Sequence, residues 1–306
     1  MNAFRFKDTF RQQFHSMKTN KAVYGLMAPY LIFFFTFVVL PVVMSALYSF
    51  TYFNGFSTPV FVGLENFIKL FARDTVFLNA LQNTVVIAVI TGLIGYLLCF
   101  GLAWMINEMP PKIRAVMTLV FYAPSISGQV FLIWKILFSG DYYGIINGFL
   151  INSGFSNEPV QWLTDTKYMM SVVIVVQLWL SLGTGFLAFI AGFQGVDKTL
   201  YEAAAVDGVK NRFQEIWYVT LPSMRPILLF GAVMQITASF SVSQVPMQLT
   251  GFPSTDYATH TIVTHLVDYG TIRFDVGYAS SIAVFLFVLT VGANKIIQRF
   301  LKTVGE

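Results

Sequence analysis

Two short rows of hydroxyl and amide side chains lie within otherwise apolar stretches of this sequence. Each row has the spacing i, i+4 and i+7, which places its members on one face of a helix. The rows are Gln177, Ser181 and Thr184, and Thr237, Ser241 and Gln244. Neither row contains a charged residue, so their chemistry suits hydrogen bonds to a neutral or weakly charged, hydroxyl-rich molecule. Because polar stripes are costly in lipid, we expect them to face a wet cavity or, alternatively, to hydrogen-bond neighbouring helices.

A second candidate region is the long polar segment 194–226, which is expected to fold as a helix–turn–helix. Residues 198–206 are strong helix formers, with Glu202 and a run of alanines. Asp207 and Gly208 then signal a turn, because glycine accepts a positive φ without steric cost. The nearly flat alanine face would let another protein approach the backbone of this helix closely.

The second helix of this segment is expected to carry an apolar face made by Phe213, Ile216 and Trp217. Leu221 and Pro222 are expected to end it, because proline lacks the N–H that a helix interior uses. A loop that only connected two helices would need few residues. The length of the segment therefore indicates that it transmits force.

The elements that hold these residues are predicted to lie in a bilayer. The 306 residues are 56% hydrophobic and 11% charged, with a mean hydropathy of +0.67. A soluble domain carries about 25% charged residues, so this chain could not cover a water-facing surface. A span needs about 20 mostly apolar residues. Six such runs are present, at residues 24–50, 83–107, 115–138, 168–193, 226–249 and 278–298. The predicted fold class is an all-α polytopic membrane protein with six transmembrane helices.

Prolines interrupt two of these runs. Pro124 lies in the third, and Pro246 lies in the fifth among several hydroxyl residues. Proline bends a helix and frees carbonyl groups, which in a membrane must face protein or a water-filled cavity. The third and fifth spans are therefore expected to line a cavity, with a purely structural kink as the alternative.

The distribution of Lys and Arg predicts that both termini are cytoplasmic. With the N-terminus inside, the inner segments contain fourteen of these residues and the outer segments four, whereas acidic residues divide almost evenly. The net charge of +4 and the pI of about 9.0 therefore reflect topology, and no nucleic-acid partner is expected. Lys135 lies near the outer end of the third span beside Trp134, where its long stem can reach the interface.

Two kinds of segment lie outside the spans. Residues 1–23 are a basic tail whose apolar stripe suits the inner leaflet, with disorder as the alternative. The stripe consists of Phe6, Phe10, Phe14 and Met17. No cleavable signal peptide is expected, and residues 24–306 are predicted to form one transmembrane domain. The outer segments, long enough to form a docking surface, are residues 51–82, 139–167 and 250–277.

The sequence contains no residue set typical of a catalytic or metal site. Cys99 is the single cysteine, so it can form neither an internal disulfide nor a thiolate cluster. His260 and His265 lack a carboxylate at metal-ligand spacing, so no metal site is expected. The phosphate-binding pattern G-x-x-x-x-G-K-[ST] is absent, and no bound cofactor is predicted.

The segment 194–226 also resembles a known signature. Glu202-Ala203-Ala204, followed after three residues by Gly208 and then by Leu221-Pro222, resembles the EAA motif of permease subunits of binding-protein-dependent ABC importers. Five further stretches resemble the maltose-type carbohydrate uptake family, at residues 62–67, 144–147, 161–163, 249–253 and 276–279. The resemblance covers nearly everything from residue 24 onward, and it departs from the family pattern at Val209 and Phe252.

This resemblance implies the type I ABC importer permease fold and a mechanism. The chain would be one membrane subunit in the bacterial plasma membrane, paired with a second permease subunit that is a paralogue. Two separate ATPase subunits would bind ATP and Mg, and an external sugar-binding protein would deliver a carbohydrate, an oligosaccharide. The motif would act as a coupling helix held in a cleft of the ATPase, with Glu202 as a candidate for an ion pair. The coupling residues implied are Glu202, Ala203, Ala204, Asp207, Gly208, Leu221 and Pro222.

The resemblance also bears on the substrate. It places sugar contacts near Leu180, Ser181, Thr184, Met234, Ala238 and Ser241. With the two polar rows, the candidate substrate-binding set is Gln177, Leu180, Ser181, Thr184, Thr237, Ser241 and Gln244. Met234 and Ala238 stand where the family has polar residues, so the sequence does not indicate maltose as the cargo.

Three other function classes fit the sequence less well. An ion-coupled secondary transporter is expected to place charged residues inside its spans, and only Lys135 is available, at an edge. A membrane enzyme would need acid, base or nucleophilic groups clustered at one interface. A structural scaffold would leave the segment 194–226 without a purpose.

Overall fold

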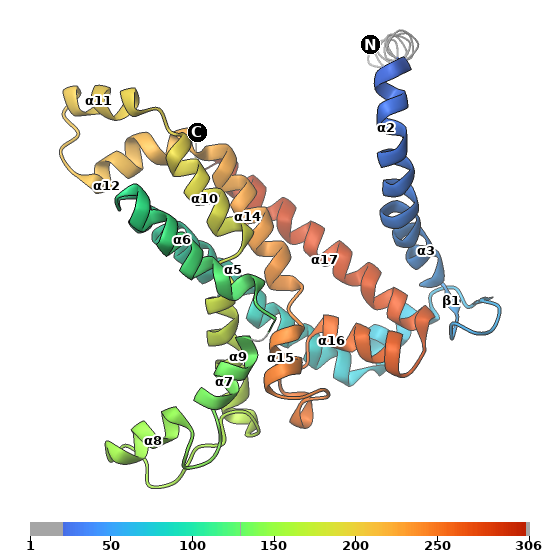
Figure 1. Cartoon of the computed structure of the whole chain (residues 1–306). Coiled ribbons are helices and arrows are strands. Elements are labelled where there is room, and N and C mark those ends of the chain that lie inside the picture. The colour runs from blue at the N-terminus through green and yellow to red at the C-terminus, as the bar shows by residue number, and fades with distance from the viewer. Residues whose placement is uncertain (1–20, 129, 304–306) are drawn as a thin grey trace.

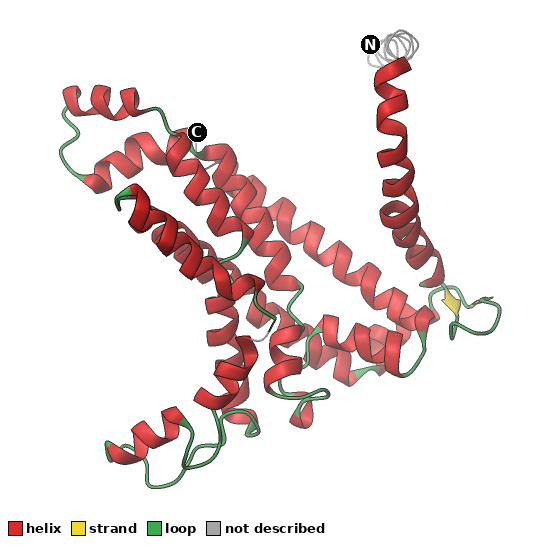
Figure 2. Ribbon diagram, viewed as in Figure 1, coloured by secondary structure: helices red, strands yellow, loops and turns green. Residues whose placement is uncertain are grey.

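The structure is a computed structural model that describes residues 21–128 and 130–303. Helices make up most of the described chain, whose strands form one short hairpin (Figure 2). By length and composition, four of the described helices can cross a membrane, or up to six if each of two bent pairs is one span. The predicted apolar stripe from Phe6 to Met17 lies outside the described residues and stays a prediction.

The first span stands apart from the other helices over most of its length and meets them only near its end (Figure 1). It comprises α2 (Lys21–Phe34), the π-helical turn η1 (Phe35–Val39) and α3 (Leu40–Tyr48). None of its most apolar stretch is buried, and α3 contacts the last helix, α17 (Val276–Thr303). Its apolar surface is therefore left free for lipid or for another membrane subunit.

A small subdomain, on the side that the sequence predicts to be outer, connects the first two spans. Its elements are β1 (Thr51–Tyr52), β2 (Val60–Phe61), α4 (Glu65–Ile68) and η2 (Lys69–Arg73). The two strands pair antiparallel, with Thr51 opposite Phe61. The buried amide of Asn66 donates to the carbonyls of Ser49 and Thr51 at 2.9 Å each, which ties the subdomain to the end of the first span.

The longest helix, α5 (Thr75–Asn107), is the central element of the bundle. It begins at Thr75 and not at residue 83, because the Asp74 carboxylate accepts a hydrogen bond from the N–H of Phe77 and caps the helix. It packs against α10 (Thr184–Gly195) and α14 (Arg225–Phe240), and the three helices form the main core.

The third span is broken. Its two helices, α6 (Pro111–Ile126) and α7 (Val130–Leu137), meet at 85°. Pro124 lies in the last turn of α6, and the N–H of Ser127 closes that turn on the carbonyl of Pro124 at 3.3 Å. The predicted interruption at Pro124 is confirmed. On the outer side the chain continues into α8 (Ile145–Asn152).

Both spans that carry the polar rows are interrupted as well. Three non-helical residues, 181–183, separate α9 (Thr166–Leu180) from α10, and residues 241–243 separate α14 from α15 (Gln244–Leu249). Pro246 lies in the first turn of α15, where a missing N–H costs little, so the break precedes it. The prediction that each row continues along one helix face is therefore wrong.

The segment between the fourth and fifth spans is a helix–turn–helix, as predicted. Its elements are α11 (Lys198–Val206), α12 (Arg212–Glu215), η3 (Ile216–Thr220) and α13 (Leu221–Ser223). The prediction that Leu221 and Pro222 end the second helix is wrong. Pro222 lies at the start of α13, where its missing N–H is tolerated, and the chain turns by 83° only at Met224.

The last outer loop folds onto the ends of α5 and α17. It contains η4 (Thr255–Tyr257), α16 (Ile262–Val267) and η5 (Asp268–Ile272). His260, 2% exposed, and His265, 1% exposed, form a chain of hydrogen bonds with Asp74. Nε2 of His265 lies 3.0 Å from Oδ2 of Asp74, and its Nδ1 lies 3.3 Å from Nε2 of His260. The hydroxyl of Tyr278 also donates to Asp74, at 2.7 Å.

The titration of these groups follows from their contacts. Burial raises the pKa of Asp74, but hydrogen bonds from His265, the Phe77 N–H and Tyr278 outweigh it and hold that pKa well below its usual range. Burial, together with the charge that His265 can carry, lowers the pKa of His260 from 6.5 to about 4. The docked loop therefore binds fewer protons than an open loop whose His260 is solvated.

We expect the docking of this outer loop to weaken in acid. The contribution of His260 is complete above pH 6.5 and is lost as the pH falls from 6.5 to about 4. In that window the opening constant should rise by about tenfold per pH unit. Amide hydrogen exchange of residues 254–261, corrected for intrinsic rates, should show this increase, and His260→Gln should remove it. An increase of equal size in His260→Gln would contradict the assignment.

Candidate functional site

The helix α11 projects at one end of the molecule, beyond the ends of the spans (Figure 1). The side chain of Asp197 caps it by accepting from the N–H of Thr199 at 3.0 Å, and this backbone hydrogen bond lowers the pKa of Asp197. No residue of α11 is buried, and Glu202 and Ala203 are exposed. The helix thus offers its backbone and the Glu202 carboxylate to a partner.

The turn after α11 has the predicted geometry. Gly208 has a φ of +95°, a conformation that favours glycine. The N–H of Gly208 donates to the carbonyl of Ala205 at 3.3 Å, and the N–H of Val209 donates to that of Ala204 at 3.0 Å. No atom lies within 4 Å of the position of a Cβ on Gly208, so only backbone conformation constrains this residue.

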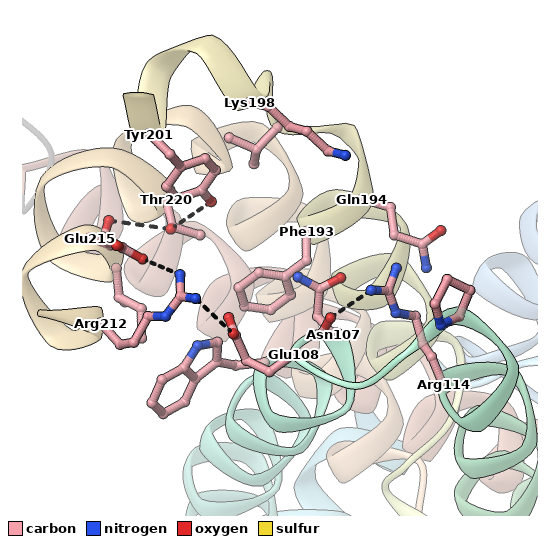
Figure 3. Close-up of a pocket in the computed structure, with 14 residues that line it drawn as sticks. Asn107, Glu108, Arg114, Phe193, Gln194, Lys198, Tyr201, Arg212, Glu215 and Thr220 are labelled. Atoms are coloured by element: carbon pink, nitrogen blue, oxygen red, sulfur yellow. Dashed lines mark hydrogen bonds and ion pairs between the residues drawn. The ribbon is translucent and has the colours of Figure 1, made fainter. Parts of the chain in front are cut away.

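A pocket of about 510 Å³ lies between this helix–turn–helix and the inner ends of α5 and α6 (Figure 3). Arg212 crosses it: one guanidinium nitrogen lies 2.7 Å from Glu215, and another lies 3.6 Å from Glu108 at the end of α5. The hydrogen bond that Arg212 donates to Glu215 is the main reason that the pKa of Arg212 is raised. Beside this ion pair the rings of Trp104 and Phe213 lie 5.7 Å apart.

The two helices of the segment are also joined to each other. The hydroxyl groups of Tyr201, on α11, and Thr220, on η3, lie 2.9 Å apart, and the Thr220 hydroxyl reaches the carbonyl of Glu215 at 3.3 Å. Leu221 is half-buried and Pro222 is exposed. Of the predicted coupling residues, Leu221 and Pro222 lie in α13, just before the bend at Met224, whereas the others lie on α11 and in the turn that follows it.

A second, polar pocket of about 200 Å³ lies where the third, fourth and fifth spans break. It contains four residues of the predicted substrate-binding set: Gln177, Leu180, Ser241 and Gln244. Sequence reasoning missed the contribution of Ser125, Ser127 and Phe131 from the third span, and the predicted substrate-binding set left out Ser243, which also lines the pocket. Pro124, which was expected to mark a cavity-lining span, lies in its wall. No described residue that lines this pocket is charged.

Three predicted members of the substrate-binding set lie outside this pocket. The Ser181 hydroxyl donates to the carbonyl of Leu178 at 2.6 Å. Thr184 is exposed at the start of α10. Thr237 donates to the carbonyl of Val233 at 2.8 Å and accepts from the amide of Asn294 at 3.3 Å, so it faces α17.

These three residues leave the pocket because the helices end between the members of each row. Ala238 and Met234 stand at the two positions where the resembled family has polar residues. Ala238 lines the pocket and Met234 does not. The spacing of i, i+4 and i+7 holds only along an unbroken helix. The breaks therefore separate Ser181 and Thr184 from Gln177, and Thr237 from Ser241 and Gln244.

The chain is similar to known proteins in sequence and in fold. A family described as the inner membrane component of binding-protein-dependent transport systems matches residues 111–304. The probable ABC transporter permease protein YesP of Bacillus subtilis (strain 168) is 29% identical over 290 residues, covering 92% of this chain and 91% of that protein. The lactose transport system permease protein LacF of Rhizobium radiobacter is 28% identical over 278 residues, covering 89% of this chain and 90% of that protein.

A solved structure has the same fold. A bacterial ABC transporter involved in the import of the acidic polysaccharide alginate contains a chain that matches with a TM-score of 0.77 and 23% identity. The match covers 96% of this chain and 100% of the other. It confirms the predicted fold, which is that of a type I ABC importer permease.

Proposed function

Because the chain belongs to the family of inner membrane components of binding-protein-dependent transport systems, we propose that it moves a carbohydrate into the cytoplasm as one membrane subunit of an ATP-driven importer. The observation that carries the proposal is the exposed helix α11 with its turn at Gly208, held beyond the ends of the spans. A helix that offers a flat alanine face outside the bilayer suits docking into a cleft of another protein.

The proposed assembly follows from what this chain lacks. Its sequence contains no phosphate-binding loop, so ATP and Mg bind to two separate ATPase subunits. Closure of those subunits moves α11, and the spans then expose the polar pocket alternately to either side of the bacterial plasma membrane. A second permease subunit, a paralogue, completes the path, and an external binding protein delivers the sugar to the outer loops. Both termini lie in the cytoplasm, on the side of α11.

The chemistry of the polar pocket supports a neutral carbohydrate. Its described lining supplies hydroxyl groups from Ser125, Ser127, Ser241 and Ser243, amides from Gln177 and Gln244, and the ring of Phe131. Hydroxyl and amide groups exchange hydrogen bonds with sugar hydroxyls, and an aromatic ring stacks on a sugar face. The lactose permease relative also handles a neutral sugar. We therefore assign a neutral oligosaccharide as the cargo.

We expect the purified chain alone to hydrolyse no ATP, because no loop in its sequence can cradle the phosphates. The same chain, purified from its native membrane in mild detergent, should carry ATPase subunits, and the complex should hydrolyse ATP. Phosphate release and mass spectrometry of the co-purified chains measure both points. ATP turnover by the isolated chain, or a chain that never retains an ATPase, would contradict the proposal.

A further inference from the structure

The helix–turn–helix touches a span to which it is not covalently adjacent. The chain connects it directly to α10 and α14, but Arg212 pairs with Glu108 at the end of α5 (Figure 3). The ring of Phe213 also lies 5.7 Å from that of Trp104 on α5. Trp104 lies within the last turn of α5, and Glu108 follows that helix directly. Movement of the segment therefore displaces α5 by contact as well as α10 and α14 by connection.

Farther along, α5 contacts the residues beside the polar pocket. The Cys99 sulfur lies 3.3 Å from the carbonyl of Ser181, and the amide of Gln235 donates to the carbonyl of Thr91 at 3.0 Å. At Gly95 the helices approach so closely that a Cβ would collide with the side chains of Gln235 and Ser181. Cys99 and Gln235 are buried, and this close packing lets α5 move little without its neighbours also moving.

Both contacts of α5 lie next to the wall of the pocket. Ser181 follows Leu180 at the break between α9 and α10, and Gln235 is one turn before Ala238 on α14. Leu180 and Ala238 both line the polar pocket. From Glu108 to Gly95 the helix spans about 20 Å at 1.5 Å per residue, and no proline interrupts it.

We propose that α5 is a transmission rod, and that Trp104 and Phe213 form the contact through which ATPase-driven movement enters it. This proposal rests on the proposed function, because it assumes that an ATPase moves α11. When the segment moves, the Trp104–Phe213 contact and the Arg212–Glu108 ion pair shift the inner end of α5. The rigid helix carries this shift to Ser181 and Gln235, where it changes the pocket walls.

The fold does not depend on the contacts that Phe213 and Arg212 make with α5. Phe213 is 75% exposed, and Arg212 and Glu108 are 64% and 43% exposed at their side chains. Exposed pairs of this kind contribute little to static stability. Their loss should leave assembly intact and change only how ATP hydrolysis is linked to transport.

The test is a double-mutant cycle on the sugar transported per ATP hydrolysed. The importer, with its ATPase subunits and binding protein, is reconstituted in proteoliposomes with Trp104→Ala, Phe213→Ala or both. Each single change should lower the ratio by about threefold. The double change should lower it no further, since both remove the same contact. Trp104→Phe with Phe213→Trp, which exchanges the two rings, should restore most of the ratio.

The outcomes separate this proposal from the proposed function. The role proposed for α5 would be contradicted if the single variants kept the wild-type ratio of sugar transported to ATP hydrolysed. It would also be contradicted if the two single losses multiplied in the double variant. A wild-type complex that shows no ATP-dependent sugar uptake would overturn the proposed function instead. Thermal unfolding in detergent should match wild type for Phe213→Ala, whereas Trp104→Ala should lower stability because Trp104 also packs against the core cluster of α5 and α10. Recovery of the ratio in the ring-exchanged variant shows that the loss does not come from misfolding.

Discussion

Gly208→Pro should lower sugar uptake to less than about a tenth of the wild-type rate while leaving the protein inserted in the membrane. Gly208 has a φ of +95°, whereas proline is fixed near −65°. The substitution also removes the N–H that donates to the carbonyl of Ala205. The turn must therefore change shape, and α11 leaves the position in which it meets the ATPase.

The expected loss is specific to coupling. Gly208 is exposed, lies outside the bilayer and has open space around it, so insertion of the spans does not depend on it. Gly208→Asn is the matched control, because asparagine tolerates a positive φ, and it should keep most of the uptake. Uptake is compared with surface abundance for both variants. Normal uptake by Gly208→Pro at normal abundance would remove this turn from the mechanism.

The success of sequence reasoning around Gly208 has a local cause. The bounds of α11 follow from a capping Asp197, a run of helix formers and a glycine that ends it. Each of these signals acts over a few residues and needs no knowledge of the rest of the chain. The apolar runs that predict spans are equally local, because every residue of a span meets the same solvent.

The polar rows show where this reasoning stops. A spacing of i, i+4 and i+7 is visible in the sequence, but the breaks at 181–183 and 241–243 are not signalled by a proline at those positions. Such breaks are stabilised by contacts with other helices, such as that between Cys99 and the carbonyl of Ser181. Ser181, Thr184 and Thr237 were therefore grouped with residues that they do not join.

The contact between Trp104 and Phe213 could not be predicted for a related reason. More than one hundred residues separate the two rings in the chain, and both residue types are common in apolar stretches. Only the packing of α5 against α10 and α14 brings the end of α5 beneath the helix–turn–helix. A single sequence contains no periodicity that reports such a pair.

Gln177→Leu combined with Ser241→Leu should lower uptake of the sugar by about thirtyfold, since two hydrogen-bonding partners are lost at about 1 kcal/mol each. Both residues line the polar pocket, on α9 and directly after α14, and neither substitution introduces a charge. Leucine raises the hydropathy of both spans, so membrane insertion should be unaffected. ATPase subunits should still co-purify in normal amount, because the pocket lies far from α11.

The matched control is Thr237→Leu, which makes the same kind of change on α14 but on the side that faces Asn294. It should leave uptake within about twofold of wild type, because Thr237 does not line the pocket. The charge of the cargo is tested in the same assay. An excess of a neutral oligosaccharide should compete with uptake and an excess of a uronate oligomer should not, because an anion in this pocket would find no described cationic side chain. Unchanged uptake in the double variant, or equal competition by the uronate, would show that the carbohydrate binds elsewhere.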